Sequence, residues 1–169
     1  MRCWFCVTNP YNWLIVKQNK IWGVDYRYRK TIKDRVSEGD MLVFYVLQNM
    51  RSGLKRYIQD SGLTDQQLGE LELTRGCVMG LWEISSRYLE DNEYIGWVNR
   101  DGSPEVYPHR RKISLCWEPQ KPVSLKPNTE IFDELIFITD KTRSWYNILY
   151  SSMTLISHED LQIFKKFCK

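Results

Sequence analysis

The sequence predicts an α+β fold in which a mixed β-sheet closes into a small barrel, with helices packed outside it. Short apolar runs bounded by turn residues recur along the chain, whereas helical patterns are confined to connections and to the C-terminal end. The 169 residues, 43% of them hydrophobic and 27% charged, suit one globular domain, 1–169, that is large enough to bury a core. No internal repeat is present.

The first two strands are expected at residues 3–7 and 41–47. Both are continuous apolar runs rich in β-branched and aromatic residues, a pattern typical of strands that are buried on both faces. Between them, residues 11–17 carry apolar side chains at helical spacing, which predicts a short helix with Asn9 or Asn12 near its cap.

Residues 48–75 are polar and interrupt this series of strands. The run Thr64-Asp65-Gln66-Gln67 has the composition of a capping box and predicts the start of a short helix. We interpret the segment as an insertion that packs on the edge of the same domain.

Strand character resumes after the insertion, at residues 77–84, 106–117 and 153–156. Residues 91–104, rich in Asn, Asp and Gly, predict a loop between the first two of these. Residues 157–160 have the pattern of a helix cap, and the C-terminal helix that follows places Leu161, Phe164 and Phe167 toward the core.

The charge is informative mainly through its distribution. A net charge of +3 is mild, but cations concentrate at 26–35, at 109–112 and at Lys165, Lys166 and Lys169. Each cluster alone is equally consistent with a solvated surface. The longest apolar run, 41–47, is too short to span a bilayer, and the N-terminus lacks the features of a signal peptide. We therefore expect a cytoplasmic protein with no membrane partner.

The cysteines indicate neither a disulfide framework nor a metal site. Five is an odd number, and Cys3 and Cys6 form a C-x-x-C pair within a predicted strand, where residues three apart point to opposite faces. No second Cys or His pair is available to complete a zinc site. We expect buried structural cysteines, and no metal or cofactor.

Candidate catalytic groups are few. Of the two histidines, His158 lies in the first turn of the predicted C-terminal helix, and His109 lies among cations with no carboxylate nearby in the sequence to orient it. Motifs of serine hydrolases, phosphate-binding loops and metalloproteases are absent. This pattern favours a binding protein over an enzyme.

Two stretches combine flat rings with hydrogen-bonding groups. The first runs from Thr8-Asn9 to Trp22-Gly23-Val24, where a glycine after the tryptophan allows a ligand to approach the backbone. The second is Tyr107-Pro108-His109-Arg110-Arg111-Lys112. Rings stack on a planar heterocycle, amides read its edge, and cationic groups hold a phosphate. Together they predict a pocket for a single nucleobase. Trp13 is either core or pocket wall, and Trp145 either a lid or a plug on the barrel end.

A series of short motifs occurs in a fixed order along nearly the whole chain. They are W-F-C-V-T-N at 4–9, N-W at 12–13, W-G-V at 22–24, E-G-D at 38–40 followed by L-V-F-Y at 42–45, residues 80–85, Tyr88, Y-P-H-R at 107–110, F-I at 137–138, Trp145 and residues 156–160. In this order they resemble the EVE domain family, in its stand-alone archaeal and bacterial form. Only the insertion at about 48–75 departs from the family, because it looks longer than the usual hairpin there.

The resemblance implies a PUA-like β-barrel with flanking helices, similar to YTH domains, which cage a methylated adenine between aromatic rings. It also implies a ligand pocket, to which the matching positions contribute Asn9, Trp22, Gly23, Val24, Tyr107, Pro108 and Arg110, with Trp145 near the rim. For the nucleic-acid backbone we expect contacts from the cationic clusters, through Arg27, Arg29, Lys30, Arg111 and Lys112.

The leading hypothesis is therefore a non-enzymatic module that takes a modified nucleobase of DNA or RNA into an aromatic pocket. One alternative is a small enzyme of nucleotide or RNA metabolism that uses His109, Tyr107 and Arg110. Another is a protein-interaction module that uses the polar insertion.

Overall fold

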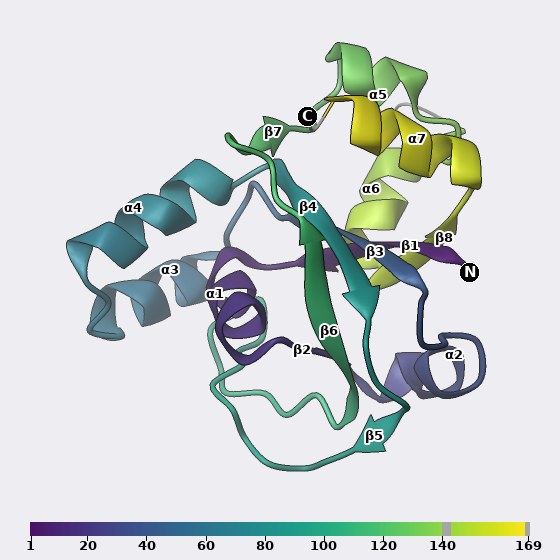
Figure 1. Cartoon of the computed structure of the whole chain (residues 1–169). Helices are drawn as coiled ribbons and strands as arrows, with labels where there is room; N and C mark the ends of the chain where they lie inside the picture. The colour runs from purple at the N-terminus through teal and green to yellow at the C-terminus, as the bar shows by residue number, and fades with distance from the viewer. Residues whose placement is uncertain (140–142, 168–169) are drawn as a thin grey trace.

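The computed structural model describes residues 1–139 and 143–167, and it shows a mixed sheet curled into a half-barrel with helices around it (Figure 1). The strands follow the order β2-β6-β4-β3-β1-β8. These strands are β1 (Cys3–Thr8), β2 (Ile21–Val24), β3 (Met41–Val46), β4 (Cys77–Ile84), β6 (His109–Trp117) and β8 (Met153–Ile156). Two short strands, β5 (Leu89–Glu90) and β7 (Val123–Ser124), pair with β6 and β4. The predicted fold class is confirmed.

The pairing explains why the sheet is mixed. β1 runs parallel to β3 and antiparallel to β8, and the pairs β2–β6, β3–β4 and β4–β6 are antiparallel. The expected strand at 106–117 begins only at His109, because residues 105–108 belong to the preceding loop. Pro108 cannot donate a ladder hydrogen bond, which is consistent with a strand that starts directly after it.

Tyr28 joins the two ends of the curled sheet. It lies just beyond β2, and its hydroxyl accepts a hydrogen bond from the Ser152 N–H at 3.1 Å and lies 3.2 Å from the Ser151 hydroxyl, just before β8. The two outermost strands of the order are thereby linked through side-chain and backbone groups rather than through a strand ladder.

The helices occupy the predicted connections and the C-terminal end. They are α1 (Pro10–Asn19), the short 3-10 helix η1 (Tyr26–Tyr28), α2 (Arg29–Asp34), α3 (Ser52–Asp60), α4 (Asp65–Thr74), α5 (Glu130–Glu134), α6 (Arg143–Tyr150) and α7 (His158–Phe167). Asn9 caps α1, because its side chain accepts a hydrogen bond from the Asn12 N–H. Thr64 and Gln67 form the expected capping box at α4. Both predicted caps are confirmed.

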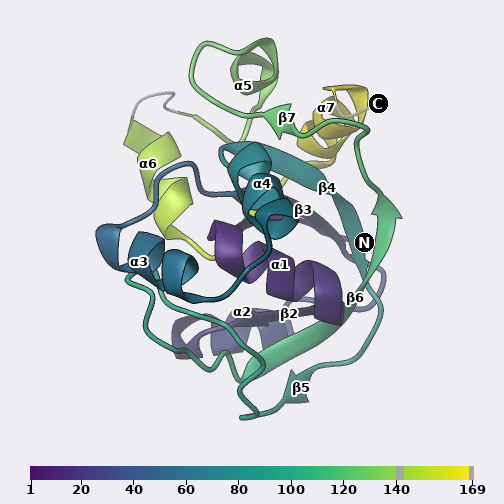
Figure 2. The ribbon, with the colours of Figure 1, turned by 90° about the vertical axis from the view of Figure 1, so that its left-hand side faces the viewer.

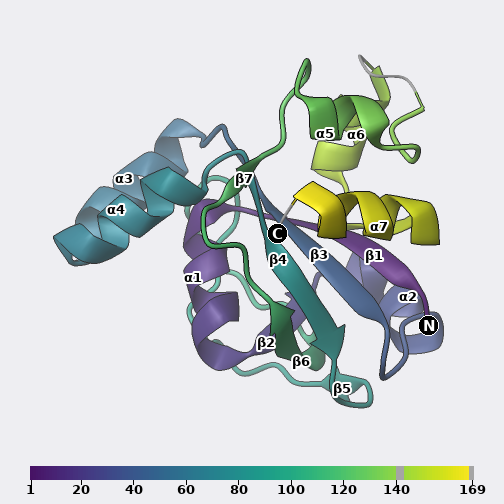
Figure 3. The ribbon, with the colours of Figure 1, turned by 45° about the horizontal axis from the view of Figure 1, so that its top comes forward.

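Two apolar cores lie on opposite faces of the sheet. The inner core lies on the face covered by α1 and α2 and contains Trp4, Trp13 and Trp82. The outer core lies on the opposite face, which is covered by α5, α6 and α7 (Figures 1 and 3). Cys3 belongs to the outer core and Cys6 to the inner one, so their side chains point to opposite faces as predicted.

The segment 48–75 folds into α3 and α4, which lie side by side next to α1 (Figures 2 and 3). They share a small apolar cluster with the loop that follows β5, made of Leu54, Ile58, Leu71 and Val98. The contact is close: a Cβ on Gly53 would lie 2.1 Å from the Asp101 carbonyl oxygen. The start of α3 is therefore seated directly on the turn of that loop.

Candidate functional site

A cavity of about 480 Å³ opens where the end of β1, the start of α1, β2 and the 91–107 loop meet. Its volume lies within the usual range for small-molecule sites. The aromatic side chains that line it are Trp22, Trp97, Tyr107 and Tyr150, and the arginines are Arg27, Arg51 and Arg100. The parallel pair β1–β3 directs both of its carboxyl ends toward this region, since Thr8 and Val46 are register partners and the next residue, Leu47, also lines the cavity.

Gly23 allows the aromatic wall to form. A Cβ at this position would lie 2.6 Å from the Trp97 ring and 3.0 Å from the Tyr107 Cβ, so any larger residue would collide with both. The two rings of Trp97 and Tyr107 are tilted against each other, with centroids 5.2 Å apart. Trp22, on the other face of the strand, is 4% exposed and meets Phe44 edge-on. The structure thus brings together Trp22, Gly23 and Tyr107.

Backbone groups of β2 add a hydrogen-bonding edge. The Ile113 N–H donates to the Lys20 carbonyl at 2.9 Å, so Lys20 and Ile113 form a hydrogen-bonded pair. Such pairs alternate along an antiparallel ladder, and the next ones in this register are Trp22–Arg111 and Val24–His109. The N–H and C=O of Gly23 therefore point away from β6, along the free edge of β2. The cavity lies across this edge, with one ring on one face and two rings on the other.

Asn9 lines the cavity, but its amide is already engaged. It donates to the Val98 carbonyl at 3.1 Å and accepts from the Asn12 N–H at 2.8 Å. Asn12 exchanges two further hydrogen bonds with the Val98 backbone. The two amides tie the loop to the start of α1, so Asn9 shapes the cavity and is not a free reader of a base edge.

Arg110 does not line the cavity, contrary to the expectation for it. Its side chain is 1% exposed and donates to the Asp91 carboxylate at 2.6 Å, to the Tyr107 carbonyl at 2.9 Å and to the Glu93 carbonyl. The guanidinium also lies over the Trp97 ring, 5.1 Å from its centre. Arg110 therefore holds the 91–107 loop in place behind the aromatic wall.

Three other expected pocket residues lie outside the cavity lining. Val24 is 1% exposed and belongs to the inner core, and Pro108 is half-buried just before β6. Trp145 is 4% exposed and packs against Phe5, Tyr45 and Phe132 in the outer core. Trp145 therefore packs between α6 and the outer face of the sheet, a position that is neither a lid over the cavity nor a plug in the barrel end.

The expected backbone-binding cations divide into two groups. Arg27, Arg29, Lys30 and Lys112 are exposed, although Arg27 pairs with Asp25 at 2.6 Å and Arg29 lies 3.8 Å from Glu90. Arg111 is 5% exposed and donates to the carbonyls of Ile32 and Val36, which fixes the end of α2. Burial of its guanidinium removes it from any phosphate at the surface, so this expectation was wrong.

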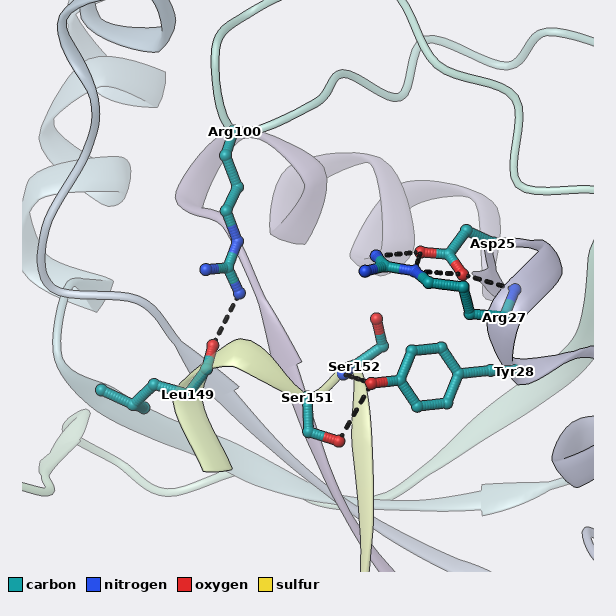
Figure 4. Close-up of polar contacts among 7 residues, drawn as sticks. All are labelled: Asp25, Arg27, Tyr28, Arg100, Leu149, Ser151 and Ser152. Carbon is teal, nitrogen blue, oxygen red and sulfur yellow. Dashed lines mark hydrogen bonds and ion pairs between the residues drawn. The ribbon is translucent and has the colours of Figure 1, made fainter. Parts of the chain in front are cut away.

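Arg51 and Arg100 were missed by the sequence analysis, as was Trp97. Figure 4 shows Arg100 on one side of the site and the Asp25–Arg27 pair on the other, with the Tyr28 contacts to Ser151 and Ser152 below. The only sequence signal for Trp97 was a large ring inside an otherwise polar loop. Its position in the cavity depends on contacts with residues distant in sequence.

Protonation states follow from burial. Burial raises the pKa of Tyr107 to about 12, so its hydroxyl remains a hydrogen-bond donor at neutral pH. Burial lowers the pKa of His109, whose Nδ1 lies 2.7 Å from the Tyr88 hydroxyl outside the cavity lining. Tyr107 and His109 therefore do not face a common space as the enzyme alternative required. Among residues 1–139 and 143–167, no three His, Cys, Asp or Glu side chains form a possible metal site.

No helix in the described part of the chain is long and apolar enough to cross a membrane.

A curled mixed sheet with a partly aromatic cavity at the free edge of one strand defines a small half-barrel protein. The EVE domain family model matches residues 2–163, and the chain belongs to the EVE domain family. A UPF0310 protein of Pyrococcus abyssi is 32% identical over 165 residues, covering 96% of both chains. A UPF0310 protein of Pyrococcus horikoshii is 29% identical over 168 residues, covering 98% of both.

Solved structures with the same fold include human THYN1 in complex with DNA containing 5-methylcytosine, at a TM-score of 0.55 and 12% identity, with 98% of this chain and 96% of that chain covered. The YTH domain of Zygosaccharomyces rouxii MRB1, in complex with N6-methyladenosine RNA, has a TM-score of 0.52 and 16% identity, with coverage of 99% and 88%. At these identities the likeness concerns the fold, which is PUA-like as the motifs implied.

Proposed function

We propose that this protein is a non-enzymatic nucleic-acid-binding module that takes a modified base of DNA or RNA into the cavity at the edge of β2. The observation that carries the proposal is the arrangement of Trp22 on one face of that edge and of Trp97 and Tyr107 on the other. A planar heterocycle entering the cavity would meet the Tyr107 ring, the small exposed parts of the Trp22 and Trp97 rings and, at the Gly23 backbone, one N–H donor and one C=O acceptor.

The energetics suit a base that carries an extra methyl group. Stacking on an aromatic side chain contributes about 1–3 kcal/mol per base, and a buried methyl group contributes about 0.8 kcal/mol more. Taking a base out of a duplex costs a few kcal/mol. Since these terms nearly balance, the methyl group and the phosphate contacts together would decide whether an extruded base is retained.

The relatives support the same conclusion. The two similar structures described above hold DNA with 5-methylcytosine and RNA with N6-methyladenosine, respectively. Phosphate contacts would come from exposed cations around the cavity, chiefly Arg27 and Arg51, with Arg29, Lys30 and Lys112 extending the surface.

The test is a binding screen of matched DNA and RNA oligonucleotides with and without modified bases. Trp22→Ala and Tyr107→Leu should each lower affinity for the preferred ligand roughly 5- to 150-fold by removing a stacking face. Tyr107→Phe, which keeps the ring, is the matched control and should retain discrimination.

Circular dichroism and urea unfolding must show that each variant is folded, because Trp22 is nearly fully buried and its truncation creates a cavity. Absence of binding to every oligonucleotide by the wild type, or full affinity in folded Tyr107→Leu, would contradict the proposal.

A further inference from the structure

Tyr150, the last residue of α6, lines the cavity and yet leaves 66% of its surface exposed. One helical turn earlier, Tyr146 is also 66% exposed. The opposite side of the helix is occupied by Trp145 and Ile148, which are buried in the outer core. One face of α6 therefore anchors the helix in the outer core, and the other face exposes the rings of Tyr150 and Tyr146. Of these two rings, Tyr150 is the one that lines the cavity.

Arg100 holds the first of these rings. Its guanidinium donates to the Leu149 carbonyl at 2.6 Å (Figure 4) and lies 5.0 Å from the centre of the Tyr150 ring. The hydrogen bond to the end of α6 fixes the arginine, and the cation–π contact covers one side of the ring. Because most of the tyrosine surface is still exposed, the other side is open to a ligand.

The charges at the cavity match a phosphodiester chain leading from it to Tyr150. Arg51 is the residue that precedes α3, and Arg100 and Arg27 lie on opposite sides of the site (Figure 4). The acidic groups among the lining residues are Asp25, which is paired with Arg27, and Asp101. The three cations thus exceed the two carboxylates.

We propose that Tyr150, backed by Arg100, stacks the base adjacent to the one in the cavity, and that Tyr146 extends this platform. The inference rests on the proposed function and specifies its ligand: a single-stranded segment of at least two nucleotides. In a duplex the faces of a neighbouring base are covered by its own stack, whereas in a single strand a face is available to an aromatic side chain.

The experiment compares four ligands that carry the same modified base: the nucleoside, a single-stranded trinucleotide, the same trinucleotide with abasic neighbours, and a duplex. Tyr150→Leu should weaken the intact trinucleotide roughly 5- to 150-fold more than it weakens the nucleoside. Tyr150→Phe keeps the ring face and should bind as the wild type does.

The abasic trinucleotide closes a double-mutant cycle. For the wild type it should bind as weakly as the intact trinucleotide binds Tyr150→Leu, and combining both changes should cause no further loss. Leu155→Ala, an exposed apolar position on β8 outside the cavity lining, is the control variant and should bind normally.

The inference is overturned if the wild type binds both the nucleoside and the trinucleotide but Tyr150→Leu weakens the trinucleotide no more than it weakens the nucleoside. It is also overturned if the duplex binds as tightly as the single strand. Failure of the wild type to bind any of the four ligands would instead contradict the proposed function itself.

Discussion

Gly23→Ala tests whether the aromatic wall depends on the missing side chain of β2. The new Cβ would lie 2.6 Å from the Trp97 ring, which is 0.8 Å closer than the 3.4 Å at which ordinary contact begins. Trp97 cannot readily retreat, because it is 1% exposed and the Arg110 guanidinium lies over its ring. The backbone φ of Gly23 is not positive, so the effect is a steric one.

The expected magnitude follows from two opposing contributions. Overpacking a well-filled site costs about 1–3 kcal/mol. Replacing a strand glycine by alanine stabilises the folded state by about 0.5–1 kcal/mol, because the unfolded chain loses conformational freedom. Gly23→Ala should therefore lower the free energy of unfolding by about 0–2.5 kcal/mol, measured by urea denaturation, and should also weaken ligand binding by displacing Trp97.

Gly69→Ala is the matched control. It makes the same change in α4, where no atom lies within 4 Å of the new Cβ, and should raise stability by about 0.5–1 kcal/mol. If Gly23→Ala is as stabilising as Gly69→Ala, the wall does not rest against the strand and the steric reasoning is refuted.

Three further predictions concern residues around the wall. Arg110→Lys should cost about 1.5–3 kcal/mol of stability by losing charged hydrogen bonds, and should speed amide exchange in the 91–107 loop; Asp91→Asn should cost less, because that carboxylate is 44% exposed. Burial lowers the pKa of His109 below its usual 6.5, so its contribution to stability is present above pH 6.5 and is lost as the pH falls below that value. Urea unfolding at several pH values should show a shallower acid loss for His109→Asn, and an unchanged profile would contradict this assignment. Tyr107 should titrate near pH 12 in an ultraviolet difference titration against Tyr107→Phe.

The sequence predicted the framework because the framework depends on local patterns. Apolar runs in the sequence predicted β1, β3 and β4. The caps of α1 and α4 were predictable because the capping side chains lie within a few residues of the start of each helix. Trp22, Gly23 and Tyr107 could be anticipated as cavity residues because each lies beside a turn or strand end.

The arginines could not be assigned in this way. In a strand, adjacent side chains point to opposite faces, so Arg110 and Arg111 lie in unrelated environments although they are neighbours in the sequence. Arg111 donates to Ile32, 79 positions earlier, and Arg110 to Asp91 across a loop. A cluster of cations looks the same in the sequence whether its partners are phosphates or distant carbonyls.

The junction between β1 and β8 has a consequence for synthesis of the protein. Cys3 pairs with Ile156, and Tyr28 contacts Ser152, so β1 gains its second neighbouring strand only from residues far later in the sequence. On the ribosome, β1 therefore remains unpaired on that side until β8 has been made and has emerged. Truncations that remove β8 should leave an exposed strand edge and an aggregation-prone product.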